Sequence, residues 1–206
     1  MSLHNVRTQD LASELGSRSD LIDNRGRINF TEVYNLLTKL SPIPCSDGVP
    51  VRFNQGIVEG ALIVRGTGLY RGKYAMVGGR IAYEQDLREA LKVHFLTDLG
   101  LPMTLLSDWH HPDYVYQYHP KIGQKDFGHD PSKHAIGLTY LVSIPNRSPR
   151  FGSSVHGDQE ALNLHWFSST NCPPSEMFAF NHNVAWKACL EKAMGDPVIM
   201  SKLNGR

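Results

Sequence analysis

Residues 78–101, GGRIAYEQDLREALKVHFLTDLGL, decide the fold. Two glycines end a short strand-like run, a polar loop follows, and the spacing predicts an amphipathic helix over residues 84–99. The apolar residues of this helix recur at helical intervals and share one face, namely Leu87, Ala90, Leu91, Phe95 and Leu99. Gly100 is a typical C-terminal stop. The stretch is therefore a strand–loop–helix unit that places backbone groups beside one face of a helix.

Polar residues occupy another face of the same helix. His94 and Asp98 are four residues apart, so their side chains are neighbours on the helix surface. A carboxylate there, together with a glycine carbonyl from the loop, offers the hard oxygen ligands that suit Mg²⁺. The alternative interpretation is a helix face that only contacts solvent.

Strands and helices follow one another on both sides of this unit without a regular βαβ alternation. A run with helical spacing ends before two prolines, at residues 31–40, and another covers residues 184–194 with a cap near Asn181 or Asn183. A long polar loop is expected at residues 122–133. Strand-like runs lie at residues 49–53, 57–65, 74–79, 113–120, 134–144 and 162–168. This order predicts an α+β sandwich.

Composition excludes several classes of protein. The 206 residues carry 21 Lys+Arg and 20 Asp+Glu, and a net charge of +1 argues against a nucleic-acid-binding surface. The three cysteines are too few and too scattered for a disulfide framework or a zinc knuckle, which favours free thiols in a reducing compartment. No stretch approaches 18 consecutive apolar residues, and the N-terminus has no signal-peptide pattern, so we expect a cytoplasmic protein that contacts no membrane.

The stretch Gly78–Leu101 resembles a Nudix box, whose pattern is G-x5-E-x7-R-E-U-x-E-E-x-G-U. Aligning Gly100-Leu101 with the end of the pattern places the first box glycine at Gly79 without a gap. The family's carboxylate positions then fall on Gln85, His94, Thr97 and Asp98, and its arginine on Val93. Only Asp98 keeps a carboxylate. The resemblance implies a Nudix α/β/α sandwich with a mixed β-sheet over residues 42–206, preceded by an N-terminal helical extension over residues 1–41.

The GGR opening, Gly78-Gly79-Arg80, is similar to that of the GDP-mannose mannosyl hydrolase branch of the family. The resemblance implies that the Gly78 carbonyl, Asp98 and Glu160 bind one Mg²⁺, with Mn²⁺ as a substitute. Glu160 begins an E-x5-W pattern that ends at Trp166. Further residues match positions of that branch, namely Arg65 and Arg80 for diphosphate, His134 at the start of a strand, and Asp47 for a sugar pocket.

The position after Glu160 is the main departure from that branch. Its catalytic histidine corresponds here to Ala161, so another group must serve as general base or the activity is lost. Candidate bases are His94, His134, His156 and His165. A second possibility is that His94 joins Asp98 and Glu160 in a site for Mn²⁺ or Fe²⁺.

The expected function is a divalent-metal-dependent hydrolase of a nucleoside diphosphate linked to another group, with a sugar as the expected group. Glu160, Arg80, Arg65 and His134 are the predicted catalytic residues. Tyr114, Tyr116 and Tyr118 share one strand face, which is either core or a stacking wall, and Tyr116 is the predicted substrate contact. The resemblance also implies a homodimer with a small-molecule partner. The alternative is a catalytically weak Nudix-like domain that binds a nucleotide sugar or a protein.

Overall fold

The computed structural model describes residues 37–82, 84–121, 128–152 and 159–205. The chain divides into two units, Met1–Pro42 and Ile43–Arg206. In the first unit, residues 37–40 are helical, which agrees with the end of the helix expected at residues 31–40. The rest of that expected helix lies outside the described residues.

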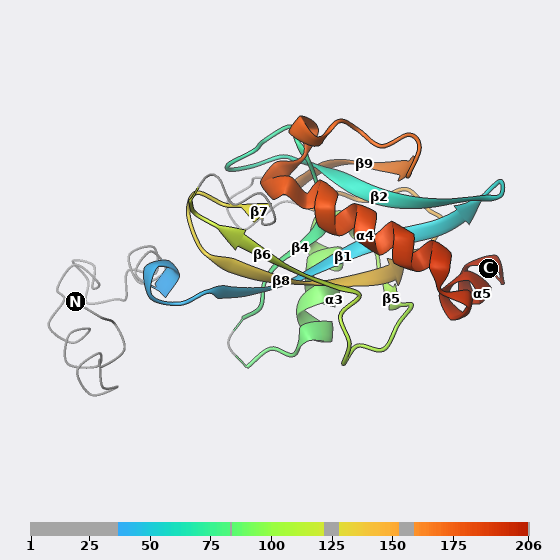
Figure 1. Ribbon diagram of the computed structural model, residues 1–206, viewed down its shortest axis with the longest axis horizontal. Helices are drawn as coiled ribbons and strands as arrows, with labels where there is room; N and C mark the ends of the chain where they lie inside the picture. The colour runs from blue at the N-terminus through green and yellow to red at the C-terminus, as the bar shows by residue number, and fades with distance from the viewer. Residues whose placement is uncertain (1–36, 83, 122–127, 153–158, 206) are drawn as a thin grey trace, which may run out of the picture. The chain divides into compact units, whose positions relative to one another are not determined.

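The second unit is built on one mixed sheet of nine strands among the described residues (Figure 1). Its central order is β3-β2-β1-β8-β6-β7, with β4 also paired to β1, β5 to β8 and β9 to β2. The pairs β1–β8 and β6–β7 are parallel and the others are antiparallel. The strand bounds are β1 Ile43–Asn54, β2 Ile57–Arg65, β3 Tyr74–Ala75, β4 Val77–Arg80, β5 Thr104–Leu105, β6 Tyr114–His119, β7 Gly128–His129, β8 Ala135–Ser143 and β9 Ala161–Ser168.

Strand β1 is longer than its sequence predicts. Alternation indicated a strand only at residues 49–53, but β1 begins at Ile43 because eight of its residues pair in parallel with β8. Its far end forms a hairpin with β2 through the turn at Gln55 and Gly56, both with positive φ. A strand buried on both faces loses the polar alternation by which a half-exposed strand is recognised.

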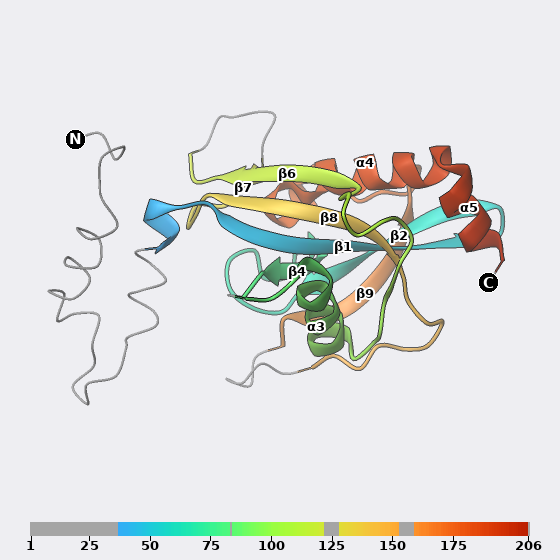
Figure 2. The same ribbon diagram turned by 90° about the horizontal axis from the view of Figure 1, so that it is seen from below.

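Helices cover both faces of the sheet, as Figure 2 shows: α3 lies on one side, and α4 with α5 on the other. Helix α3, Leu87–Leu99, begins after Asp86, whose side chain accepts the Glu89 N–H, and ends at Gly100 with φ 61°. The predicted start at residue 84 is therefore three residues early, and the predicted stop is confirmed. Helix α4, His182–Gly195, starts at one of the two expected caps, Asn181.

Three further helical segments were not predicted. Two 3₁₀ turns, η3 at Ser175–Met177 and η4 at Ala179–Asn181, lead into α4. Helix α5, Pro197–Asn204, follows α4 directly and is capped by Asp196, which accepts the N–H groups of Val198 and Ile199. The Asp-Pro start of α5 is a recognisable helix signal, because proline is favoured at the first helical position.

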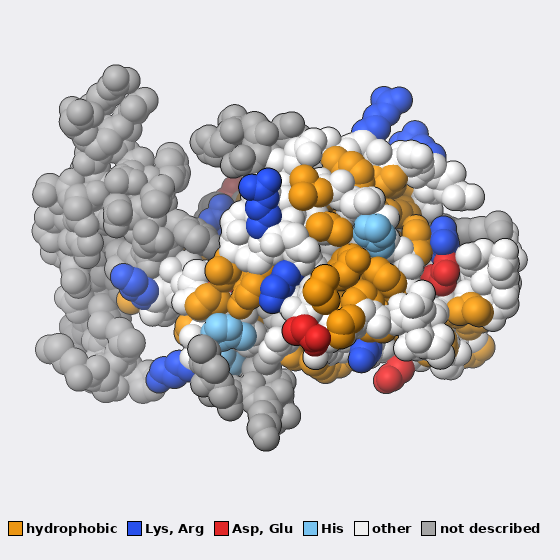
Figure 3. Space-filling model, turned by 90° about the horizontal axis from the view of Figure 1, so that it is seen from above, with side chains coloured by type: hydrophobic (Ala, Val, Ile, Leu, Met, Phe, Trp, Pro, Cys, Tyr) orange, Lys and Arg blue, Asp and Glu red, His pale blue; other side chains and the backbone are white. Residues whose placement is uncertain are grey.

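Two hydrophobic clusters fill the layers on either side of the sheet. One packs the sheet against α4 and α5 around Trp186, and the other packs it against α3 around Phe95. Helix α4 approaches β2 closely at Gly60, where a Cβ would overlap Leu190 and Trp186. The predicted α/β/α sandwich with a mixed sheet is confirmed. Figure 3 shows that hydrophobic side chains also gather in the middle of one face, with charged side chains around them.

Candidate functional site

Two adjoining cavities lie where β4 meets α3. We call the first, of about 310 Å³, the acidic cavity; it is lined by Gly78, Gly79, His94, Thr97, Asp98, Gly152 and Glu160. We call the second, of about 190 Å³, the arginine cavity; its lining includes Asp47, Arg65, Gly78, Gly79, Arg80, Tyr118, Lys133, Glu160, Phe180 and His182. The two share Gly78, Gly79 and Glu160, so a ligand in one cavity lies beside a ligand in the other.

The sheet register and one helix bring these residues together. Gly78 of β4 is paired with Asp47 of β1, which sets that carboxylate next to the glycine backbone. Helix α3 presents His94 and Asp98, one turn apart, to the acidic cavity. Glu160 comes from the segment that leads into β9, more than 60 residues further along the chain. The predicted ligands Gly78, Asp98 and Glu160 therefore line a single cavity.

Asp98 is a buried acid with an unsatisfied oxygen. Its side chain belongs to a residue that is only 5% exposed, and no hydrogen-bond partner for Oδ2 lies within the described part of the chain. Burial raises the pKa of Asp98 to about 7, the nearby Glu160 carboxylate adds to this, and Arg65 opposes it. A buried acid without a partner, next to a second acid, is an arrangement that a bound cation would stabilise.

Glu160 is held by the segment that follows β2. Its Oε1 accepts from Arg65 Nη1 at 2.9 Å, and its Oε2 accepts from Thr67 Oγ1 at 2.6 Å. The Glu160 carbonyl accepts the N–H of Gly66 at 2.8 Å. Gly66 is required here because a Cβ at that position would overlap the Gln159 carbonyl oxygen. Both carboxylate oxygens of Glu160 are thus occupied by side chains of residues 65–67.

Arg65 is tethered on more than one side. Its Nε donates to the Leu69 carbonyl at 3.3 Å, and its guanidinium carbon lies 5.1 Å from the centre of the Phe180 ring. Phe180 and the next residue, Asn181, both have positive φ, a conformation that costs energy for non-glycine residues. This strained turn keeps the aromatic ring against the guanidinium at the wall of the arginine cavity.

Buried acid and base groups line the rest of the arginine cavity. Burial raises the pKa of Asp47 to about 7, against the opposing effect of Lys133. Lys133 also pairs with Asp130 at 3.5 Å. His182 accepts the Met76 N–H at 3.0 Å, and burial, followed by the charge of Arg65, lowers its pKa to about 3. His182 is therefore neutral and supports the backbone next to β4.

His94 is the candidate base that lines the acidic cavity. Its Nε2 lies 3.2 Å from the Arg80 carbonyl oxygen, which makes Nε2 the protonated nitrogen, and its ring packs on Gly79. Burial lowers the pKa of His94, so the ring is neutral near pH 7. The hydrogen bond ties α3 to the glycine-containing strand.

Other predicted site residues lie elsewhere. Tyr116 is 3% exposed and belongs to the hydrophobic cluster on the α4 side. Tyr118, on the same strand face, belongs to that cluster and also lines the arginine cavity. His134 stacks on His119 with ring centres 4.4 Å apart and lines neither cavity. His165 packs against Tyr74. The remaining candidate base, His156, lies outside the described residues.

Sequence reasoning missed several residues that line the two cavities or contact their walls. Thr67, Lys133 and His182 carried no motif, and only their tertiary contacts indicate a role. Tyr118 was named as part of the strand face that it shares with Tyr116, but Tyr116 was chosen as the substrate contact. Trp166, the end of the E-x5-W pattern, lines a separate cavity of about 570 Å³, where the Arg52 guanidinium lies 4.2 Å from its ring centre.

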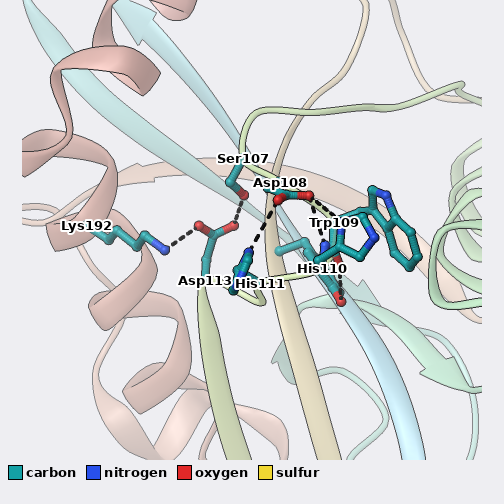
Figure 4. A network of polar contacts seen from close by, with 8 residues as sticks. Ser107, Asp108, Trp109, His110, His111, Asp113 and Lys192 are labelled. Atoms are coloured by element: carbon teal, nitrogen blue, oxygen red, sulfur yellow. Dashed lines mark hydrogen bonds and ion pairs between the residues drawn. The ribbon is translucent and has the colours of Figure 1, made fainter.

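A second polar network lies at the start of β6, away from the two cavities (Figure 4). The buried carboxylate of Asp113 pairs with Lys192 of α4 at 2.8 Å and accepts from Ser107 Oγ and the Leu141 N–H, each at 2.6 Å. In the preceding loop, the Asp108 carboxylate contacts the Nδ1 atoms of the adjacent pair, His110 and His111. These contacts fix the loop between β5 and β6.

Metal ligands are few in this site. Among the described residues, no three side chains of His, Cys, Asp and Glu are grouped so that they could hold a metal ion. A site made of His94, Asp98 and Glu160 is thus not supported. The set of two carboxylates and one backbone carbonyl still fits Mg²⁺, which commonly binds one or two carboxylates and takes its other ligands from water and substrate phosphates.

No helix within the described residues is long and apolar enough to span a membrane.

Comparisons with known proteins place this fold. A family profile described as a domain of unknown function (DUF4916) matches residues 24–196. No curated protein matches the chain. Among solved structures, a protein from Jonesia denitrificans described as a possible asymmetric diadenosine tetraphosphate hydrolase is 29% identical, with a TM-score of 0.62, covering 75% of this chain and 96% of that one.

Two more distant structures share the fold. A MutT/Nudix family protein from Enterococcus faecalis is 14% identical with a TM-score of 0.58, covering 84% of this chain and 74% of that one. The Nudix domain of Shewanella oneidensis NrtR, solved with ADP ribose, is 11% identical with a TM-score of 0.53, covering 88% and 97%. The chain therefore has the fold of the Nudix hydrolases.

Proposed function

Because the chain belongs to the DUF4916 family and has the Nudix fold, we propose that it is a divalent-metal-dependent hydrolase of a nucleoside diphosphate linked to another group. The single observation that carries the proposal is the shared wall of the two cavities. The acidic cavity lies on one side of Glu160 and Gly78, and the arginine cavity lies on the other. A diphosphate that spans this wall would meet a cation on one side and guanidinium groups on the other.

The proposed cation ligands are the Gly78 carbonyl, Asp98 and Glu160. A divalent cation bound there would neutralise charge on the diphosphate. The orphaned Asp98 Oδ2 favours this assignment, because it is buried and has no partner among the described residues. Mg²⁺ is the expected ion, with Mn²⁺ as a substitute.

Arg65 and Arg80 would bind the diphosphate oxygens and stabilise charge that develops on the leaving group. Both line the arginine cavity. His94 is the proposed base in place of the missing histidine at Ala161. It is neutral and lines the acidic cavity, and with Nε2 bonded to Arg80, Nδ1 remains to accept a proton from water.

A sugar is the proposed second moiety, in line with the GDP-mannose mannosyl hydrolase resemblance. The arginine cavity adjoins the proposed diphosphate position and is lined by Asp47, Tyr118 and Lys133, whose polar groups suit sugar hydroxyls. The Tyr118 hydroxyl is buried without a partner among the described residues, so a ligand hydroxyl that reached it would satisfy its hydrogen bonding. His134 as a catalytic residue and Tyr116 as a substrate contact remain predictions.

The alternative is a domain that binds a nucleotide derivative without turning it over. Two observations favour it: Glu160 already has partners on both carboxylate oxygens, and no group of three metal-ligating side chains occurs in the described part of the chain. The Nudix domain of the Shewanella protein was solved with ADP ribose bound. A nucleotide-binding role would use the same arginine cavity.

A panel of nucleoside diphosphate sugars, dinucleoside polyphosphates and ADP ribose distinguishes the two. Each compound is incubated with Mg²⁺ or Mn²⁺, and the nucleotides, sugar phosphate or free sugar that are formed are separated and measured. Turnover that is lost in Asp98→Asn and Glu160→Gln, but kept in Glu59→Gln, supports the hydrolase. Glu59 is a matched control because it forms a similar ion pair with Arg52 outside both cavities. Binding without cation and without turnover of any compound refutes it in favour of the binding domain.

Oligomeric state and location stay predictions. We expect a homodimer in the cytoplasm, with no nucleic-acid partner. Light scattering at the mass of one chain would exclude the dimer.

A further inference from the structure

The ion pair between Arg65 and Glu160 joins a proposed phosphate ligand to a proposed cation ligand. On the basis of the proposed function, we infer that this ion pair exchanges partners. Glu160 Oε1 leaves Arg65 and binds the cation, and the released Nη1 of Arg65 binds the substrate diphosphate. Cation and diphosphate would then bind cooperatively, because each removes a competitor of the other.

The contacts of Glu160 allow such an exchange. Oε1 is bonded to Arg65 and Oε2 to Thr67, so Thr67 can keep the side chain in place while Oε1 changes partner. The Glu160 side chain is 38% exposed and lies on the wall common to both cavities. Its backbone is fixed separately through the Gly66 N–H. Only Oε1 therefore needs to change its partner.

The contacts of Arg65 are arranged in the same way. Nε is bonded to the Leu69 carbonyl, and the guanidinium lies against Phe180, so the group stays in the arginine cavity when Nη1 is released. Arginine suits this role because its several donors act independently and also match phosphate oxygens in pairs. A lysine has only one ammonium group, so no second nitrogen would hold the side chain in the cavity while the first changed partner.

The local charge favours binding of the cation before the diphosphate. Asp98, Glu160 and Arg65 together carry one net negative charge when both acids are ionised, which attracts a divalent cation but not a diphosphate. A bound cation reverses that sign and favours the diphosphate. Thermodynamic linkage requires the coupling to be reciprocal, with a typical size of about 5–150-fold in affinity.

The test is binding of Mn²⁺ alone to the full chain, without nucleotide, by isothermal titration calorimetry at pH 8. We expect Arg65→Met to bind Mn²⁺ at least about fivefold more tightly than wild type, because Oε1 is no longer occupied. Arg65→Gln should give the same gain and serves if the methionine variant is unstable. Arg52→Met, which breaks the separate Arg52–Glu59 pair at 2.7 Å, should change nothing.

A double-mutant cycle separates partner exchange from simple charge repulsion. In a Glu160→Gln background, Arg65→Met should no longer tighten Mn²⁺ binding. An equal gain in that background would overturn the exchange, as would unchanged or weaker binding by Arg65→Met alone. Either result leaves the proposed function intact as long as Asp98→Asn abolishes binding. Binding by Arg65→Met when wild type shows none supports the exchange; no binding by either protein refutes the exchange and the proposed metal site together.

Discussion

Replacing Asp98 with asparagine should stabilise the protein at alkaline pH in the absence of divalent cations. In the folded chain the pKa of Asp98 is about 7, raised first by burial and then by Glu160. The folded state therefore keeps a proton that the unfolded state, with an ordinary pKa near 3.8, releases. Stability from this group is fully present below about pH 4 and is lost as the pH rises through 7.

The size of the effect follows from the same values. A pKa of about 7 against 3.8 corresponds to roughly 4 kcal/mol, at about 1.4 kcal/mol per pH unit. Between pH 5 and pH 8 only the part from pH 5 to about 7 is measured, at most about 2.7 kcal/mol, and we expect about 1–3 kcal/mol because relaxation and water penetration lower the cost of a buried charge. Asp98→Asn cannot ionise, so this part of the pH dependence should disappear, and Mg²⁺ should raise the melting temperature of wild type at pH 8 but not that of the variant.

Urea unfolding at pH 5 and pH 8, in EDTA and in Mg²⁺, measures both effects. Asp86→Asn is the matched control, because Asp86 lies at the exposed end of the same helix and asparagine caps helices almost equally well. The control should keep the wild-type pH dependence. The reasoning fails if wild type and Asp98→Asn lose the same free energy of unfolding between pH 5 and pH 8 in EDTA.

Three further predictions concern the scaffold around the site. The pKa of His182 is lowered from 6.5 to about 3, so the folded protein should lose up to roughly 4–5 kcal/mol of stability as the pH falls from 6.5 towards 3. In acid-unfolding curves the variant His182→Gln should show a smaller loss. Asp113→Ala should lower the free energy of unfolding by about 3 kcal/mol, because Lys192 and the Leu141 N–H lose their partner; a urea midpoint equal to that of wild type would contradict this. Gly60→Ala should lower the free energy of unfolding by about 1–3 kcal/mol, because the added methyl group overpacks against α4. A melting temperature equal to that of wild type would contradict this.

Local sequence patterns predicted the elements whose contacts are local. Helix α3 follows from the spacing of its apolar residues and from Gly100, and β2 was predicted with its observed bounds, residues 57–65. The start of β1 and the whole of α5 were missed for different reasons. The first depends on pairing with β8, about 90 residues away, whereas the second had a recognisable Asp-Pro start.

The candidate site, like the fold, could be predicted only in part. The proposed ligands Gly78, Asp98 and Glu160 were predicted through a family resemblance in sequence, and they line one cavity. That Glu160 also pairs with Arg65 and Thr67 could not be predicted, because those contacts span more than 90 residues of chain. Tyr116 shows the limit of pattern reasoning, because Tyr116 and Tyr118 share one strand face and yet only Tyr118 lines the arginine cavity.

The sequence alone determined most of helix α3, its end at Gly100 and strand β2, because periodicity and turn residues act over a few positions. Only the tertiary structure decided which ionisable groups are buried together and which neutralise one another. Electrostatic interactions depend on distance and on exclusion of water, and neither can be read from spacing along the chain. The unsatisfied oxygen of Asp98 and the pairing of Glu160 are therefore properties of the fold.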